Sequence, residues 1–154
     1  MELGTFGVVF AFAIYLEEKS AKFYEEVTSI LESPEARNLL TLLGTEVKKR
    51  KKKLGKTRQE FIRESILVHV TGLKRSNYEV KVGLLQDIGD QQLLKKALEL
   101  EENSYQFYKD AATKIGVPDV KRTFKRLAKE NSDRQLQIRT LQRQLRGFNR
   151  GRIE

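Results

Sequence analysis

The chain contains an internal repeat, and this repeat limits the possible folds more than any other feature. A shift of 84 positions aligns residues 13–46 with residues 97–130 without a gap, and ten positions are identical. About two identities would arise by chance if each position matched at roughly 6%. The clearest match is LEEKSAKFYEE at 16–26 against LEENSYQFYKD at 100–110. At 154 residues, the chain is expected to form one domain of two related halves.

Each half has the pattern of a helical hairpin. Apolar residues recur at three- and four-residue steps, which is the period of an amphipathic helix. Ser33 and Pro34 suit the cap and the first position of a helix, so they predict a short turn before the second helix. The predicted helices are 6–32, 34–62, 90–115 and 118–146.

These helices predict a single all-α domain, a four-helix bundle over residues 1–146. Its two hairpins would cover 6–62 and 90–146. The crossover at 63–89 is long enough to run the length of a bundle. Residues 147–154 are rich in glycine and arginine, and they are expected to form a frayed basic tail.

The composition supports helix and excludes several kinds of site. Charged residues make up 33% of the chain, only two prolines occur, and there is no cysteine. Disulfides, thiolate metal sites and cysteine nucleophiles are therefore excluded. The apolar run at 6–16 is about half the length that spans a bilayer, so it is interpreted as the start of a buried helix. A cytoplasmic location is expected.

Four glutamates lie within or beside the predicted apolar stripes. They are equivalent in pairs across the repeat, Glu17 with Glu101 and Glu46 with Glu130. If the two hairpins pack symmetrically, the four carboxylates converge at one level of the bundle. Unpaired buried charges cost several kcal/mol each. A positive group must therefore lie among them, or some must hold protons.

The paired motifs resemble those of the ferritin-like di-iron carboxylate proteins, and of the rubrerythrin branch in particular. AIYLEEKSAKFY and ALELEENSYQFY place a glutamate seven residues before a tyrosine, Glu17 before Tyr24 and Glu101 before Tyr108. The resemblance covers residues 6–146 and implies a ferritin-like bundle with the long crossover between its second and third helices. It also implies redox chemistry at two irons, with peroxide or oxygen reduction or iron oxidation as the reaction.

The sequence departs from this family where the family has the histidines of two Glu-x-x-His motifs. Lys49 follows Glu46 and Asp133 follows Glu130 at that spacing, and the only histidine, His69, lies in the crossover. This leaves two alternatives for the centre of the bundle.

In the first alternative the centre holds no metal, and Lys49, Arg50 and Arg134 neutralise the acids. In the second, iron or manganese binds to carboxylates alone, with Asp133 as a fifth ligand. That ligand set would be Glu17, Glu46, Glu101, Glu130 and Asp133. Tyr24 and Tyr108 are expected to be core aromatics, and their hydroxyls are candidates for hydrogen bonds to the carboxylates.

The second and fourth predicted helices are strongly basic, in a chain of net charge +9. The run KKRKKK occupies 48–53, and nine further lysines and arginines lie between 121 and 146. An acidic protein partner, or a homodimer formed through these helices, is expected. Nucleic acid and anionic membrane are weaker alternatives. Aromatic residues do not alternate with the basic ones, so binding of nucleic acid would depend on its phosphates and would weaken with salt.

The leading functional hypothesis is a ferritin-like scaffold or accessory binding subunit with a degenerate di-iron site. The alternative is a di-metal oxidoreductase of the rubrerythrin type.

Overall fold

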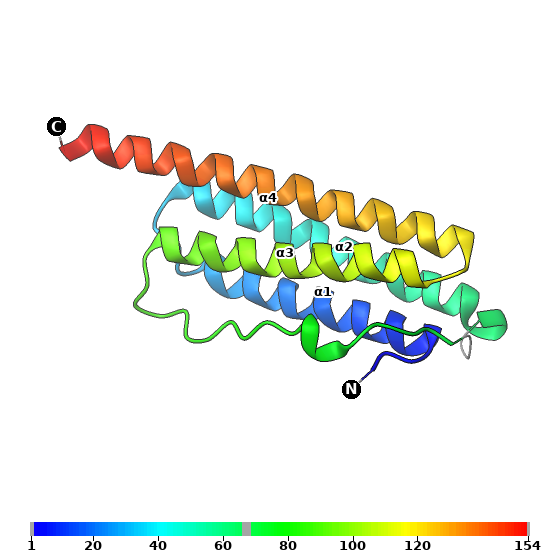
Figure 1. Ribbon diagram of the computed structural model, residues 1–154. Coiled ribbons are helices and arrows are strands. Elements are labelled where there is room, and N and C mark those ends of the chain that lie inside the picture. Colours follow the sequence, from blue (N-terminus) through cyan, green and yellow to red (C-terminus); the bar gives the residue numbers. More distant parts are fainter. Residues whose placement is uncertain (1, 66–68, 154) are drawn as a thin grey trace.

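The computed structural model describes residues 2–65 and 69–153, and it confirms the predicted all-α four-helix bundle (Figure 1). The long connection lies between the second and third helices, as expected. The helices are α1 (Phe6–Thr28), α2 (Pro34–Ser65), α3 (Asp90–Lys114) and α4 (Pro118–Ile153), with a short 3-10 helix, η1, at Arg75–Asn77.

The C-terminal ends of all four helices differ from the sequence-based bounds. The difference is one residue for α3, which ends at Lys114, and three for α2, which ends at Ser65; it is larger for α1 and α4. α1 ends at Thr28 rather than near residue 32, and α4 continues through the predicted tail to Ile153. Residue 154 and residues 66–68 of the crossover lie outside the described residues. Figure 1 shows the C-terminal end of α4 extending beyond the neighbouring helices.

The turn between α1 and α2 is joined to the start of α3. Ser33 caps α2, because its Oγ accepts a hydrogen bond from the backbone N–H of Ala36 at 3.2 Å. The carboxylate of Asp90, the first residue of α3, accepts the backbone N–H groups of Glu32 at 3.0 Å and Ser33 at 2.8 Å. Asp90 therefore links the two hairpins at this end of the bundle.

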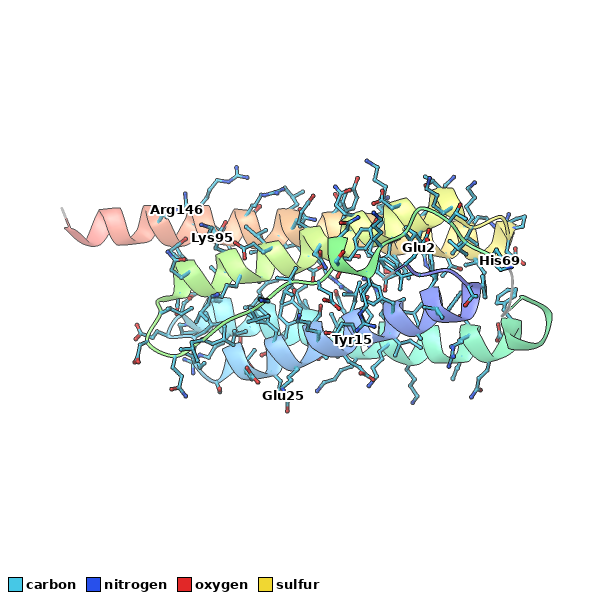
Figure 2. The ribbon with its side chains drawn as sticks, turned by 60° about the horizontal axis from the view of Figure 1, so that its bottom comes forward. Glu2, Tyr15, Glu25, His69, Lys95 and Arg146 are labelled. Carbon is cyan, nitrogen blue, oxygen red and sulfur yellow. The ribbon has the colours of Figure 1, made fainter. Side chains whose placement is uncertain are left out.

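The crossover runs along the bundle and pairs with the N-terminal residues. Isolated antiparallel bridges join Glu2 to Lys74 and Thr5 to His69, and the N–H of Leu3 donates to the carbonyl of Leu73 at 2.7 Å. His69 is exposed. Figure 2 shows Glu2 and His69 toward one end of the molecule and Arg146 at the other.

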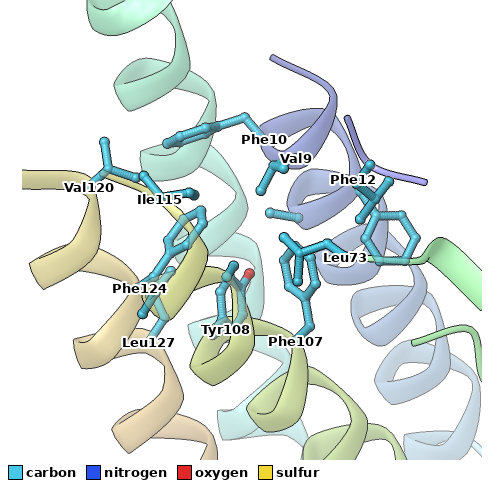
Figure 3. Packing of buried hydrophobic residues seen from close by; sticks show 14 of the residues in the cluster. Val9, Phe10, Phe12, Leu73, Phe107, Tyr108, Ile115, Val120, Phe124 and Leu127 are labelled. Atoms are coloured by element: carbon cyan, nitrogen blue, oxygen red, sulfur yellow. The ribbon is translucent and has the colours of Figure 1, made fainter. Parts of the chain in front are cut away.

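The buried apolar residues form two clusters at opposite ends of the bundle. One, the aromatic cluster, contains Phe6, Phe10, Phe12, Phe107, Phe124 and their neighbours. Figure 3 shows rings of this cluster from α1 (Phe10, Phe12), α3 (Phe107) and α4 (Phe124), with Leu73 of the crossover packed beside them. The other, the leucine cluster, contains Leu31, Leu40, Leu43, Leu93, Leu94, Ile138 and their neighbours.

Buried polar residues separate the two clusters on every helix. On α2, for example, Arg50 lies between Val47 of the leucine cluster and Leu54 of the aromatic cluster. The corresponding buried polar residues are Glu17 on α1, Glu101 on α3, and Asn131 and Arg134 on α4. Among the described residues, no helix combines the length and apolar character needed to cross a membrane.

Candidate functional site: a buried ion-pair centre

Two glutamates are buried at the middle of the bundle. Glu17 of α1 and Glu101 of α3 are each only 2% exposed. They belong to the inward stripes of their helices, between residues of the aromatic cluster and residues of the leucine cluster. Both carboxylates are removed from water, so protein groups must supply their hydrogen bonds and balance their charge.

Glu17 is paired with an arginine and a tyrosine. Arg50 Nη1 lies 3.1 Å from Glu17 Oε1, and the hydroxyl of Tyr108 donates to the same oxygen at 2.7 Å. Burial alone would lower the pKa of Arg50, but Glu17 and the other acidic groups around it raise the pKa above its ordinary value. Arg50 therefore carries a permanent positive charge at the centre.

Glu101 has neutral donors close by and a cation further away. Tyr24 donates to its Oε1 at 2.5 Å and Asn131 Nδ2 donates to its Oε2 at 2.6 Å, whereas Arg134 Nη1 lies 3.7 Å from Oε1. Burial raises the pKa of Glu101, and the charge of Arg134 and the hydrogen bond from Tyr24 oppose part of this rise. Glu101 is therefore less fully neutralised than its counterpart.

Both tyrosine hydroxyls keep their protons. Burial, and then the neighbouring carboxylate, raises the pKa of Tyr24 and the pKa of Tyr108 well above the ordinary value. Each tyrosine donates to the glutamate of the other hairpin, Tyr24 to Glu101 and Tyr108 to Glu17. The hydroxyl groups therefore connect the two halves of the molecule.

The second pair of glutamates lies at the edge of this centre. The side chains of Glu46 and Glu130 are 44% and 41% exposed. Glu46 Oε2 accepts from Arg134 Nε at 3.3 Å, and Glu130 Oε2 lies 3.6 Å from Arg50 Nη2. The four acids therefore share two guanidinium groups, but only two of the acids are buried.

The structure places Lys49 and Asp133 outside the centre, in contrast to the roles considered from the sequence. Both are exposed, and within the described residues neither takes part in an ion pair. Successive residues of a helix point about 100° apart. Because Arg50 points inward between Val47 and Leu54, Lys49 is turned toward an open groove between α2 and α4, which Asp133 also lines.

Asn131 belongs to the centre and was not among the predicted site residues. It is 2% exposed, accepts from Arg50 Nη1 at 2.9 Å through Oδ1, and donates to Glu101 through Nδ2. The sequence offered one indication of this role, because Asn131 is a polar residue on the apolar stripe of α4. A further signal was that Arg50 and Arg134 are also 84 positions apart, so the repeat continues beyond the aligned block.

The donor set does not fit a di-metal centre in this arrangement. Glu17 Oε1 already accepts hydrogen bonds from Arg50 and Tyr108, and the two oxygens of Glu101 accept from Tyr24 and Asn131. Two guanidinium groups also lie within ion-pair distance of the carboxylates that would be the ligands. In the described part of the chain, no three His, Cys, Asp or Glu side chains are gathered closely enough to hold a metal ion.

Comparisons with known proteins agree with this architecture. The family profile described as Rubrerythrin matches residues 9–134. A solved structure of a hypothetical protein from Pyrococcus furiosus has a TM-score of 0.68 at 19% identity, and the alignment covers 91% of this chain and 89% of that one. A conserved hypothetical protein from Mycobacterium tuberculosis has a TM-score of 0.66 at 10% identity, with 86% and 93% covered. At these identities the structural likeness shows the fold alone. No curated protein matches the sequence.

Proposed function

The chain belongs to the rubrerythrin family, and we propose that within this family it is a scaffold or accessory binding subunit that works without iron. In this proposal an ion-pair centre replaces the di-iron centre. The protein then contributes a rigid bundle and a basic surface on α2 and α4, and it does not catalyse a redox reaction.

One observation carries the proposal: the guanidinium groups of Arg50 and Arg134 lie among the carboxylates that the family uses as ligands. Arg50 is 4% exposed and contacts Glu17 at 3.1 Å; Arg134 is 4% exposed and contacts Glu46 at 3.3 Å. A metal cation at this point would face two fixed positive charges. The di-metal alternative requires both guanidinium groups to leave the buried carboxylates, which would cost several kcal/mol.

Metal analysis of protein purified without chelator tests the absence of iron. We expect iron and manganese well below one equivalent per chain, and no change in metal content on Glu46→Ala. Stoichiometric metal that is lost in Glu46→Ala would reject the proposal.

A gain-of-metal series tests whether the arginines prevent binding. The variant Lys49→His/Asp133→His restores both family histidines and keeps Arg50 and Arg134. We expect it to bind no iron, because the guanidinium groups still occupy the centre. When Arg50→Ser and Arg134→Ser are added to this variant, we expect iron to bind. The two arginine changes should lower the thermal stability of the protein without metal, and bound iron should restore it.

Charge on α2 and α4 supports the binding part of the proposal. Exposed cations dominate the outer surface of both helices; they include Lys48, Lys49, Lys52, Lys53 and Lys56 on α2 and Lys125, Arg126, Lys129, Arg139 and Arg143 on α4. These side chains lie on a rigid scaffold, so they can present a fixed positive surface to an acidic protein or to a second copy of the chain.

A charge-matched pair of variants tests this surface. Lys52→Gln/Lys125→Gln/Lys129→Gln removes three exposed charges from α2 and α4. Lys22→Gln/Lys95→Gln/Lys109→Gln removes the same number from α1 and α3. We expect polyglutamate binding to fall more in the first variant than in the second, and to weaken with salt.

Equal losses in the two variants would show an effect of net charge alone.

Sedimentation equilibrium tests the homodimer. Duplex DNA and anionic vesicles, titrated in parallel, test the two weaker alternatives.

A further inference from the structure

A groove lies between α2 and α4, directly over the ion-pair centre. Its volume is about 670 Å³, which lies in the range of small-molecule sites. The buried guanidinium groups of Arg50 and Arg134 line it, and the exposed cations Lys49, Lys53 and Arg126 lie on its walls. Four acids line it as well, Glu46, Glu60, Glu130 and Asp133. Glu46 and Glu130 are each paired with one of the two buried arginines, and Glu60 and Asp133 are exposed.

Arg134 makes few hydrogen bonds for a buried cation. A guanidinium has five N–H donors, and within the described residues Arg134 makes one hydrogen bond, from Nε to Glu46 at 3.3 Å. Its Nη1 is buried and has no hydrogen-bond partner in the part of the chain that the structure describes, since Glu101 lies 3.7 Å away. A buried charged donor without an acceptor is unfavourable.

Arg50 shows what Arg134 lacks. Arg50 donates from Nη1 to Glu17 and Asn131 and from Nη2 to the carbonyl of Leu127 at 3.2 Å, so only its Nε has no partner. The position equivalent to Asn131 in the first half is Val47, 84 residues earlier. Valine offers no acceptor, so the repeat leaves Arg134 without the amide oxygen that Arg50 has.

We propose that the groove binds a small oxyanion, with its carboxylate or phosphate group hydrogen-bonded to the amino groups of Arg134. Glu46 uses the Nε side of the guanidinium, and the buried Nη1 also lies 3.7 Å from Glu101. The ligand would therefore approach Arg134 from the groove, which this residue lines. A guanidinium binds two oxygens of one carboxylate or phosphate group at once. Lys49, Lys53 and Arg126 raise the local concentration of anions in the groove.

This inference rests on the proposed function in one respect, since a guanidinium rather than a metal must occupy the centre. The proposed function and the oxyanion site are tested separately. Metal analysis, with no anion added, tests the proposed function, and anion titration of the metal-free protein tests the oxyanion site.

The experiment is an NMR titration of the arginine Nε–Hε signals, with calorimetry on the same samples. Inorganic phosphate, pyrophosphate and succinate are added in separate arms, and sodium chloride holds the ionic strength constant. We expect a saturable shift of the Arg134 signal in at least one arm, and the arm with the highest affinity identifies a phosphate or a carboxylate ligand. Shifts that chloride reproduces at equal ionic strength would overturn the proposal.

Val47→Asn is the decisive variant, because it gives Arg134 an internal acceptor. We expect affinity to fall at least tenfold, whereas Val47→Ala supplies no acceptor and should retain binding. Unchanged affinity in a folded Val47→Asn protein would contradict the proposal.

A second variant covers the case in which an asparagine at this core position prevents folding. Lys49→Gln/Lys53→Gln/Arg126→Gln changes only exposed side chains, and it should weaken binding several-fold. Unchanged affinity in this variant would overturn the proposal independently.

Discussion

Arg50 and Arg134 occupy equivalent positions in the two halves of the molecule, yet their surroundings differ. Arg50 has a close carboxylate, an amide oxygen and a backbone carbonyl as acceptors; Arg134 has one half-exposed carboxylate. One part of the difference is a residue that changes across the repeat, Asn131 in the second half against Val47 in the first. The repeat therefore places two cations at the centre, and the neutral residue at this position contributes to how well each one is satisfied.

The largest expected effect comes from removing the better-paired arginine. Arg50→Met leaves Glu17 buried with one tyrosine hydroxyl as its donor, so we expect the free energy of unfolding to fall by about 3–5 kcal/mol. Arg134→Met is the matched variant from the other half. It should cost at least about 1 kcal/mol less, because Glu101 keeps the hydrogen bonds from Tyr24 and Asn131. Urea denaturation measures both, and equal losses would contradict the asymmetry.

Making the two halves alike should have the next largest effect. Asn131→Val removes an acceptor from Arg50 and a donor from Glu101, and hydrogen bonds to charged groups contribute about 1.5–3 kcal/mol each. We expect a loss of about 3 kcal/mol, the lower end of the sum for the two bonds. In an Arg50→Met background the same change should cost less, because one of its two partners is already gone. A double-mutant cycle measures this coupling, and strict additivity would contradict the shared network.

The pH dependence of stability should identify Glu101 as the less neutralised acid. Its pKa in the folded protein is raised above the ordinary value of 4.5, so the folded state holds this proton where the unfolded chain has lost it. The stability that Glu101 contributes is therefore fully present below about pH 4.5 and is lost as pH rises through the folded pKa.

Relative to Glu101→Gln, the wild type should lose at most about 1.4 kcal/mol per pH unit within that window. The exposed change Glu18→Gln is the control and should show no such slope. Denaturation from pH 4 to pH 8 makes the measurement. If the wild type instead became more stable relative to Glu101→Gln as pH rises, the raised pKa of Glu101 would be contradicted.

The smallest effect is expected at the surface, where an ion pair of similar length lies outside the centre. Lys51 Nζ is 3.1 Å from Glu18 Oε1, but these side chains are 43% and 53% exposed. We expect Lys51→Gln to change the free energy of unfolding by no more than about 0.5 kcal/mol, because water and salt screen the pair. A loss comparable to that of Arg50→Met would show that burial does not explain the contrast.

The fold was predictable because repeat, helical period and turn residues all indicated the same arrangement. The positions of Glu17 and Glu101 followed from the same stripes. The centre was harder to predict, because the family motif directed attention to position 49, whereas the inward face of α2 continues from Val47 to Arg50 and Leu54. The helical period of α2 therefore predicts the inward position of Arg50 better than the family motif does.

Other features could not be read from local patterns. Arg134 pairs with Glu46 across 88 positions of the chain, and such a contact depends on how the hairpins pack. The end of α4 was also misjudged, because Gly147 favoured an earlier stop. The Arg134–Glu46 contact depends on tertiary packing, and the end of α4 depends on a weak helix propensity that the sequence alone does not resolve.

The layer of charge between the two apolar clusters also fixes the register of the helices. If one hairpin slid along the other by a single turn, about 5.4 Å, the hydrogen bonds between the hairpins would be lost. These include the bonds of Arg50 to Asn131, Arg134 to Glu46, Tyr24 to Glu101 and Tyr108 to Glu17. Apolar side chains tolerate such sliding, because leucine against leucine is much the same one turn away. The central charges therefore admit only one axial alignment of the two halves, although the halves are similar enough in sequence to pack in several.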